Sequence, residues 1–209
     1  MWRKVDPVKP APSPANVDVR EKILTTGRRI MGGKGFSAVG LNEVLVAAGV
    51  PKGSFYHYFG SKEAFGEAML EDYFSAYLGE MDLIFSQPAQ SKAQQLASYF
   101  QAWRASQASD DCQGRCLAVK LGAEVADLSE SMRSALLRGT AGIIERLAAA
   151  LEAGVADGSL TIGGSPHSVA QGLYQLWLGA SIMVKIVRTD RPFDEAQALT
   201  DQLIHRTAS

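Results

Sequence analysis

The sequence predicts an all-α protein made of a small basic head and a larger acidic body. Apolar residues recur at helical spacing along most of the 209 residues, and no stretch alternates apolar and polar residues for long enough to form a strand. Charge divides the chain, because residues 1–62 carry a net charge of +6 and residues 63–209 carry −7. A basic head of this kind indicates a polyanionic partner.

The composition sets the broad class of protein. With 46% hydrophobic residues the chain can bury a sizeable core in one or two domains. Cys112 and Cys116 are too few for a disulfide framework, and neither a signal peptide nor an apolar run of about 20 residues is recognisable. We therefore expect a cytoplasmic protein with no membrane partner. His57, His167 and His205 fall in different predicted elements, so no metal site or cofactor is expected.

The chain should begin with a disordered arm over residues 1–16, which hold four of the eight prolines. A helix should follow, with Asn16 or Asp18 as its N-cap and a glycine-rich stop that starts at Gly32. Phe36, after that stop, is expected to plug the core of the head. We place the head at residues 17–62.

Two short helices with a tight connection complete the head. Leu41–Ala48 has apolar residues at helical spacing, Gly49 suits the left-handed residue that often ends a helix, and Pro51 suits a first turn. Lys52–Phe59 is too short to be stable alone, so its two phenylalanines should anchor it and leave a polar, acid-free face. This is the helix-turn-helix pattern, whose second helix enters the DNA major groove.

We expect residues 63–209 to form a helical regulatory and dimerisation domain. Ser61 can cap a long helix that links head to body, and Asp127 or Ser129 can cap a later one. A glycine-rich loop should cover residues 154–165. The expected body helices span about residues 62–85, 91–107, 116–125, 129–151, 166–188 and 192–205.

The segment VAAGVPKGSFYHYFGSKEAF, residues 46–65, resembles the DNA-binding signature of TetR-type transcriptional repressors, and the resemblance extends over roughly residues 19–65. It implies a homodimer that binds palindromic double-stranded operator DNA. The implied contacts are Lys52, Lys62, Tyr56 and His57 on phosphates, Ser54 on a base edge or phosphate, Gly53 for close approach, and Asn42 and Val39 on the backbone of the other side.

Two points about these contacts remain open. Tyr58 can equally be a packing residue. The short helix also lacks an Arg or Gln for bidentate reading of a base, so specificity can depend on the first helix, on Lys52 or on DNA shape.

The body resembles NemR-like members of that family, which respond to electrophiles, in the segments GRCLAVKLGAEVADLSESMRSAL and LYQLWLGASIMVKI. These contain Cys116 at a predicted helix start and Lys185 in an apolar run. A helix N-terminus and a nearby ammonium both favour the thiolate, which is the nucleophile toward quinones, maleimides, aldehydes and oxidants. Alternatively, Cys116 is a buried inert thiol and Lys185 extends to solvent. A disulfide between Cys112 and Cys116 would be geometrically demanding.

The resemblance also implies that the last two helices build a four-helix dimer interface. Its expected residues are Val169, Leu173, Trp177, Ala180, Leu199 and Leu203. A plain core stripe is the alternative, and both can hold. A dimer suits DNA reading because two heads about 34–36 Å apart can contact successive major grooves.

The sequence also allows other functions. A small apolar or cationic inducer could bind reversibly, for example to control efflux or detoxification genes, in a pocket of Tyr99, Trp103, Leu117, Met132 and Trp177. An enzyme with Cys116 as nucleophile is disfavoured, because no His or acid pair is placed to activate it. A purely structural helical protein would leave the charge asymmetry unexplained.

Overall fold

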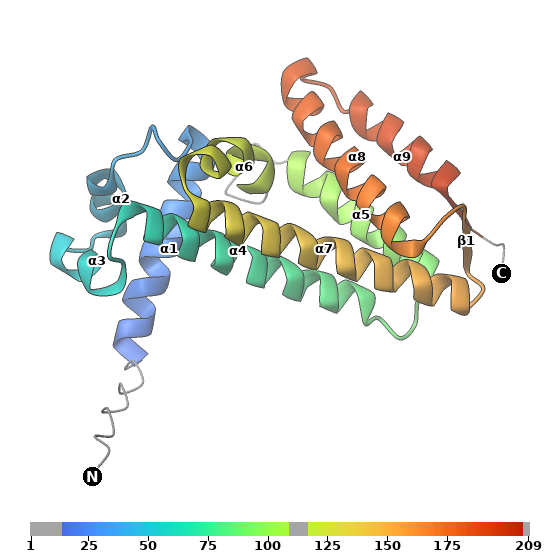
Figure 1. Ribbon diagram of the computed structural model, residues 1–209, viewed down its shortest axis with the longest axis horizontal. Helices are drawn as coiled ribbons and strands as arrows, with labels where there is room; N and C mark the ends of the chain where they lie inside the picture. Colours follow the sequence, from blue (N-terminus) through green and yellow to red (C-terminus); the bar gives the residue numbers. More distant parts are fainter. Residues whose placement is uncertain (1–13, 109–116, 207–209) are drawn as a thin grey trace, which may run out of the picture.

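The computed structural model describes residues 14–108 and 117–206, and most of these residues are helical (Figure 1). The elements are α1 (Pro14–Lys34), α2 (Leu41–Ala48), α3 (Lys52–Tyr58), α4 (Lys62–Phe85), α5 (Lys92–Ala108), α6 (Leu117–Leu128), α7 (Glu130–Ala156), β1 (Leu160–Ile162), α8 (Pro166–Val187), α9 (Arg191–Leu203) and β2 (Ile204–Arg206). The predicted all-α class is confirmed. Among the described helices, none is both long and apolar enough to cross a membrane.

The head consists of α1, α2 and α3 and lies at one end of the molecule (Figure 1). Gly35 follows α1 with φ +98° and Gly49 ends α2 with φ +61°, both in the region that favours glycine. Phe55 of α3 is fully buried, with its ring centroid 5.1 Å from that of Phe59 and 5.6 Å from that of Phe65. This aromatic cluster holds α3, because a helix of seven residues has little stability of its own.

The body is organised around α4 and α7, which run side by side (Figure 1). The Ser61 hydroxyl accepts a hydrogen bond from the Ala64 N–H at 3.1 Å, which confirms the predicted cap of α4. Gly139 of α7 faces the Phe74 ring of α4, and a Cβ at this glycine would stand 2.1 Å from the Phe74 Cγ. The two helix axes therefore approach closely at this point, and α7 also packs against α5, α6 and α8.

Buried polar contacts join α5, α8 and α9 inside the body. The Trp103 Nε1–H donates to the Ser181 hydroxyl at 2.9 Å, and that hydroxyl donates to the Trp177 carbonyl at 2.8 Å. The Trp177 Nε1–H donates to the Thr200 hydroxyl at 2.9 Å, while its ring stacks on Phe100 at 4.7 Å. Every polar group in this series of hydrogen bonds has a partner, so the series can lie in the core without an unsatisfied polar group.

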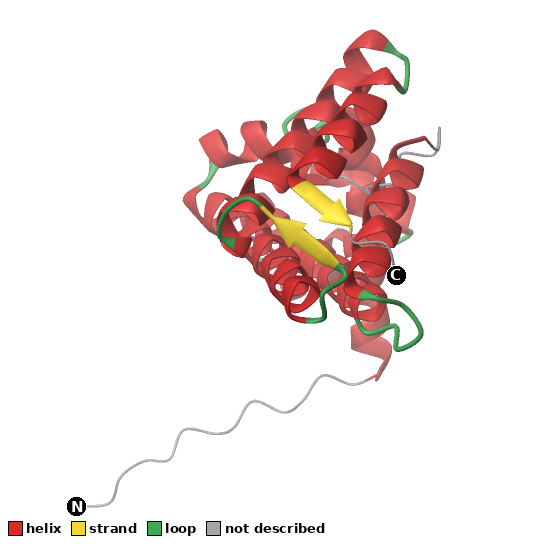
Figure 2. Ribbon diagram, turned by 90° about the vertical axis from the view of Figure 1, so that its right-hand side faces the viewer, coloured by secondary structure: helices red, strands yellow, loops and turns green. Residues whose placement is uncertain are grey.

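The structure corrects two predictions about elements. Leu160–Ile162 pairs antiparallel with Ile204–Arg206 (Figure 2), where a glycine-rich loop and the end of the last helix were predicted without any sheet. Strands of three residues are too short to show an alternating pattern. The first helix starts at Pro14, inside the predicted arm, and continues past Gly32 to Lys34, because glycine costs a helix only about 1 kcal/mol. Residues 1–13 of that arm lie outside the described residues.

Candidate functional site

The polar face of α3 is open to solvent at the end of the head. Lys52, Gly53 and His57 are exposed, and Tyr56 keeps 54% of its surface accessible. Phe55 lies between them in sequence and is buried, so α3 is anchored by one face and presents the other. This surface offers an ammonium, a phenol and an imidazole as hydrogen-bond donors, and phosphate oxygens and base edges are the acceptors they suit.

Four further residues of the predicted contact set have other environments. Tyr58 is half-buried against the core, with its ring centroid 4.9 Å from that of His57, so the packing interpretation fits it. Ser54 is also half-buried, whereas Asn42 is exposed in the first turn of α2. Val39 is fully buried, so its expected contact with the DNA backbone is wrong: its side chain belongs to the head core.

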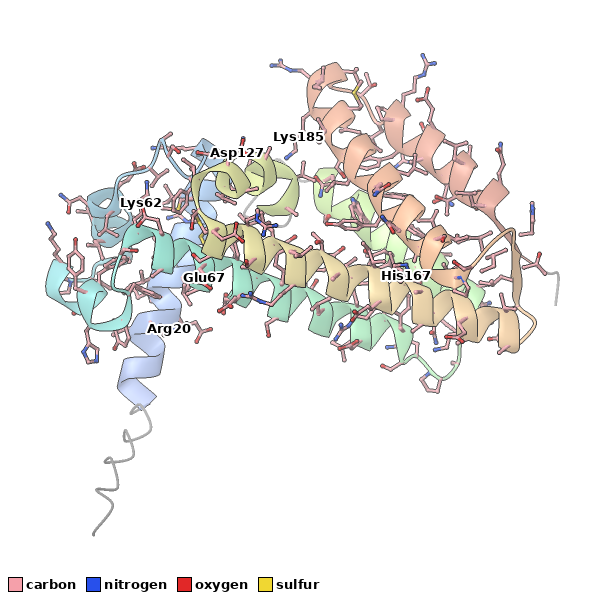
Figure 3. The ribbon with its side chains drawn as sticks, in the orientation of Figure 1. Arg20, Lys62, Glu67, Asp127, His167 and Lys185 are labelled. Atoms are coloured by element: carbon pink, nitrogen blue, oxygen red, sulfur yellow. The ribbon has the colours of Figure 1, made fainter. Side chains whose placement is uncertain are left out.

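Lys62 does not extend from the head toward solvent. Its Nζ donates to the Phe36 carbonyl at 2.8 Å and lies 4.6 Å from the centre of the Phe36 ring. Figure 3 shows Lys62 at the start of α4, close to the α1–α2 loop. The implied phosphate contact is therefore replaced in this conformation by an internal one, because a carbonyl oxygen and an aromatic face lie within reach of the ammonium.

Arg20 is a further cation near α3, outside the predicted contact set. The residue is exposed, and its guanidinium carbon lies 5.7 Å from the centre of the Phe59 ring (Figure 3). It extends the basic surface onto α1. No local signal in the α1 sequence marks this residue, because only the packing of α1 against α3 brings it there.

A cavity of about 300 Å³ lies between α4 and α5, with Arg28 of α1 in its wall. The hydroxyl oxygens of Tyr77 and Tyr99 are 3.0 Å apart in its lining. Burial, followed by the neighbouring Tyr77, raises the pKa of Tyr99, so this phenol stays neutral. The other lining residues are Tyr73, Ala76, Glu80, Met81, Ile84, Ala102, Trp103 and Ser106.

The predicted pocket only partly coincides with this cavity. Tyr99 and Trp103 line it, as expected. Leu117, Met132 and Trp177 do not: each is at most 1% exposed and packs in the core between helices. No group of three or more His, Cys, Asp or Glu in the described part of the chain could hold a metal ion.

The predicted sensing residues are only partly visible. Cys116, together with Cys112, lies outside the described residues, and α6 begins at the next residue, Leu117. Lys185 is exposed in the last turn of α8 (Figure 3). Among the described residues it takes part in no ion pair, and α8 itself packs against α6.

The α8 part of the predicted dimer stripe belongs to the core of its own protomer. The residues concerned, all between 0% and 8% exposed, are Val169, Leu173, Trp177 and Ala180. Side chains buried within one chain cannot reach a second copy, so this part of the expectation is corrected to the core stripe. The exposed large apolar residues of the two helices are Ile182, Met183, Ile186, Val187, Leu199 and Leu203.

The fold and the exposed α3 face define a helix-turn-helix DNA-binding regulator. Residues 23–69 match the family of bacterial regulatory proteins named after tetR, and residues 93–200 match the tetracyclin repressor-like C-terminal domain. The chain belongs to the TetR family. Regulators of this family bind operator DNA and act as dimers.

Individual relatives narrow this classification. The chain is 43% identical to the HTH-type transcriptional repressor NemR of Escherichia coli (strain K12), over 90% of this chain and 94% of that protein. It is 30% identical to the repressor DhaR of Mycobacterium sp. (strain GP1), over 87% and 89%. The crystal structure of reduced E. coli NemR superimposes with a TM-score of 0.86, over 92% of this chain and all of that one. The chain is therefore a TetR-family transcriptional repressor similar to NemR.

Proposed function

We propose that this repressor is released from its operator when a reactive electrophile or oxidant modifies Cys116. The observation that carries the proposal is the position of this thiol directly before α6, a helix that contacts the head through Glu124. The similar E. coli repressor was crystallised in a reduced form, which supports a thiol-based switch here.

The proposed chemical step is addition of the Cys116 thiolate to a Michael acceptor such as a quinone or maleimide. An S–C bond forms while the C=C π bond of the acceptor breaks, and the resulting enolate takes a proton from water. The N-terminus of α6 and a nearby ammonium, for which Lys185 is the candidate, would favour the thiolate. The adduct adds bulk and removes a negative charge at the start of α6, so we expect this helix to shift.

The operator contacts that we propose lie on the exposed face of α3. Lys52, Tyr56 and His57 bind phosphates, Gly53 permits close approach to the groove, and Ser54 reaches a base edge or phosphate. Asn42 adds a contact from α2 to the DNA backbone. The support is the exposure of Lys52, Gly53, Tyr56 and His57 on one acid-free face of α3, beside its buried aromatic anchor.

Release requires only a shift between two states of the dimer. A modification that favours the non-binding state by about 5.5 kcal/mol takes the population from 1:99 to 99:1. Overpacking costs about 1–3 kcal/mol, so one adduct at the start of a packed helix supplies part of this preference.

The test is a mobility-shift assay on the DNA that flanks the gene of this protein, with and without N-ethylmaleimide. Cys116→Ser should bind this DNA and ignore the reagent, while Cys112→Ser, the matched control, should respond like the wild type. Mass spectrometry should find the adduct on Cys116. A Cys116→Ser protein that still responds fully would contradict the thiol mechanism.

A second candidate is reversible induction by a small apolar or cationic molecule. The cavity between α4 and α5 favours it, because three tyrosines, Trp103 and Glu80 offer aromatic faces and one carboxylate. Ala102→Trp should fill this cavity and abolish such induction while operator binding persists. Under the thiol mechanism, Ala102→Trp should leave the response to N-ethylmaleimide intact.

A further inference from the structure

One carboxylate of the body binds two backbone groups of the loop between α1 and α2. Glu124 of α6 accepts hydrogen bonds from two consecutive backbone N–H groups, that of Phe36 at 3.0 Å to Oε2 and that of Ser37 at 2.7 Å to Oε1. Eighty-seven residues separate Ser37 from Glu124 in the chain, so the contact joins the head to a distant part of the body. Each carboxylate oxygen has its own donor, and hydrogen bonds to charged acceptors are stronger than neutral ones.

The same loop is held from two other helices. Lys62 of α4 donates to the Phe36 carbonyl, on the other side of the residue whose N–H meets Glu124. The Phe36 ring lies against Gly66 of α4. A Cβ added to Gly66 would stand 2.7 Å from a carbon of this ring and 2.5 Å from the Met132 sulfur of α7. Phe36 is thus fixed by its ring, its carbonyl and its N–H, and only the last of these contacts involves α6.

Glu124 is ionised in this arrangement. Partial burial opposes the charge, but the N–H groups of Ser37 and Phe36 and the ammonium of Lys62 outweigh it and hold the pKa of Glu124 below its usual range. A carboxylate is an acceptor at both oxygens, whereas a protonated acid or an amide is not. The negative charge is therefore the form that can bind both N–H groups at once.

The position of the head depends on such a contact. The chain passes from head to body through α4, and α1 also packs against α4 and α6. The bonds to Glu124 attach the α1–α2 loop away from the α4 axis, and there they restrict bending and rotation of the head. In a dimer, the angle of each head sets the distance between the two α3 helices, which must match two operator half-sites.

We infer that Glu124 is a positioning residue for operator binding, which fixes the head on the body and thereby sets the half-site spacing that the dimer accepts. The inference does not depend on the thiol proposal, because it concerns the unmodified protein. It rests on the two hydrogen bonds from the α1–α2 loop and on the attachment of the head through α4.

The experiment measures how strongly the full-length dimer discriminates between operator spacings. An operator is selected from random DNA with the wild-type protein, and one base pair is then inserted at its centre, which moves a half-site by about 3.4 Å and turns it by about a tenth of a turn. Fluorescence anisotropy gives the affinity ratio of the two DNAs for wild type, Glu124→Ala and Glu124→Gln. Glu71→Ala is the matched control, since Glu71 pairs with Arg138 at 2.7 Å between α4 and α7, within the body.

The wild type should discriminate most, Glu124→Gln less and Glu124→Ala least, with a ratio about tenfold smaller than the wild type. Hydrogen exchange at the Phe36 and Ser37 amides should accelerate in both variants, and Glu71→Ala should behave as wild type. If both Glu124 variants keep the wild-type ratio, or if Glu71→Ala loses as much as Glu124→Ala, the inference is overturned. Should Glu124→Ala fail to fold, Glu124→Gln, which keeps the shape of the side chain, decides alone.

Discussion

Replacing Lys52 by Ala should flatten the salt dependence of operator binding, whereas replacing Lys62 by Ala should not. Lys52 is exposed, and none of the ion pairs among the described residues involves it. A lysine that neutralises one phosphate contributes about 0.9 to the slope of log K against log salt, or about 1.8 for the two heads of a dimer. Between 50 and 200 mM salt, wild-type affinity should thus fall about twelvefold more than that of Lys52→Ala.

Replacing Lys62 by Ala should reduce the stability of the fold and leave the salt dependence of binding unchanged. The Lys62 ammonium is occupied by the Phe36 carbonyl and ring, so its removal leaves the number of phosphate contacts, and hence the slope, unchanged. Its removal should lower the free energy of unfolding by about 1.5 kcal/mol, the lower end for a charged hydrogen bond, because the residue is half-buried. Anisotropy titrations at four salt concentrations and a urea melt measure the two quantities. Equal slope losses in the two variants would refute the reasoning and show that Lys62 contacts a DNA phosphate.

Three further variants test packing in the body. Gly139→Ala should lower the free energy of unfolding by about 1–3 kcal/mol in a urea melt, because its Cβ meets the Phe74 ring. Gly79→Ala should raise it by about 0.5–1 kcal/mol, because the added Cβ would have no described atom within 4 Å beyond its own helix backbone. Ser181→Ala should cost about 1–3 kcal/mol in the same melt, since it leaves a buried tryptophan N–H without its acceptor. We expect the exposed apolar residues at the end of α8 to contribute to the dimer interface. Ile186→Asp, at a site 66% exposed, should therefore dissociate the dimer in analytical ultracentrifugation and leave the helical circular dichroism unchanged.

Periodic patterning was enough to predict most of the helices and the anchored face of α3. The reason is physical: a helix in contact with a core on one side needs apolar residues at 3.6-residue spacing, and that need is visible in the sequence. Phe55 and Tyr56 show how far this goes, since neighbouring aromatic residues were correctly assigned to the core and to solvent.

The same patterning could not say which surface a buried stripe meets. Leu173 and Trp177 lie on an apolar stripe of α8, as predicted, but the stripe faces α9 and the rest of the protomer core, not a second copy. Periodicity reports burial and carries no information on the identity of the neighbour. Leu117 and Met132 failed as pocket residues for the same reason, because a position on an apolar face can border a cavity or fill a core.

Polar contacts between distant elements were missed altogether. Glu124 belongs to a helix whose sequence shows nothing unusual, and its partners are backbone groups, which every residue carries. Lys62 was assigned by resemblance to a phosphate, and only the fold reveals that its ammonium donates to the Phe36 carbonyl. A side chain that binds backbone leaves no second residue in the sequence from which the pair could be inferred.

The contacts at the α1–α2 loop differ in how easily they can be undone. The Phe36 ring is 3% exposed between α4 and α7, so withdrawing it would expose apolar surface. The bonds to Glu124 lie nearer to solvent and can be exchanged for water at a smaller net cost. Seven residues, about 10 Å of helix, separate Glu124 from Leu117, the first residue after Cys116. Under the thiol proposal, a rigid displacement of α6 would therefore act first on the contact that is easiest to break, and the head would keep its core while it loses its fixed angle.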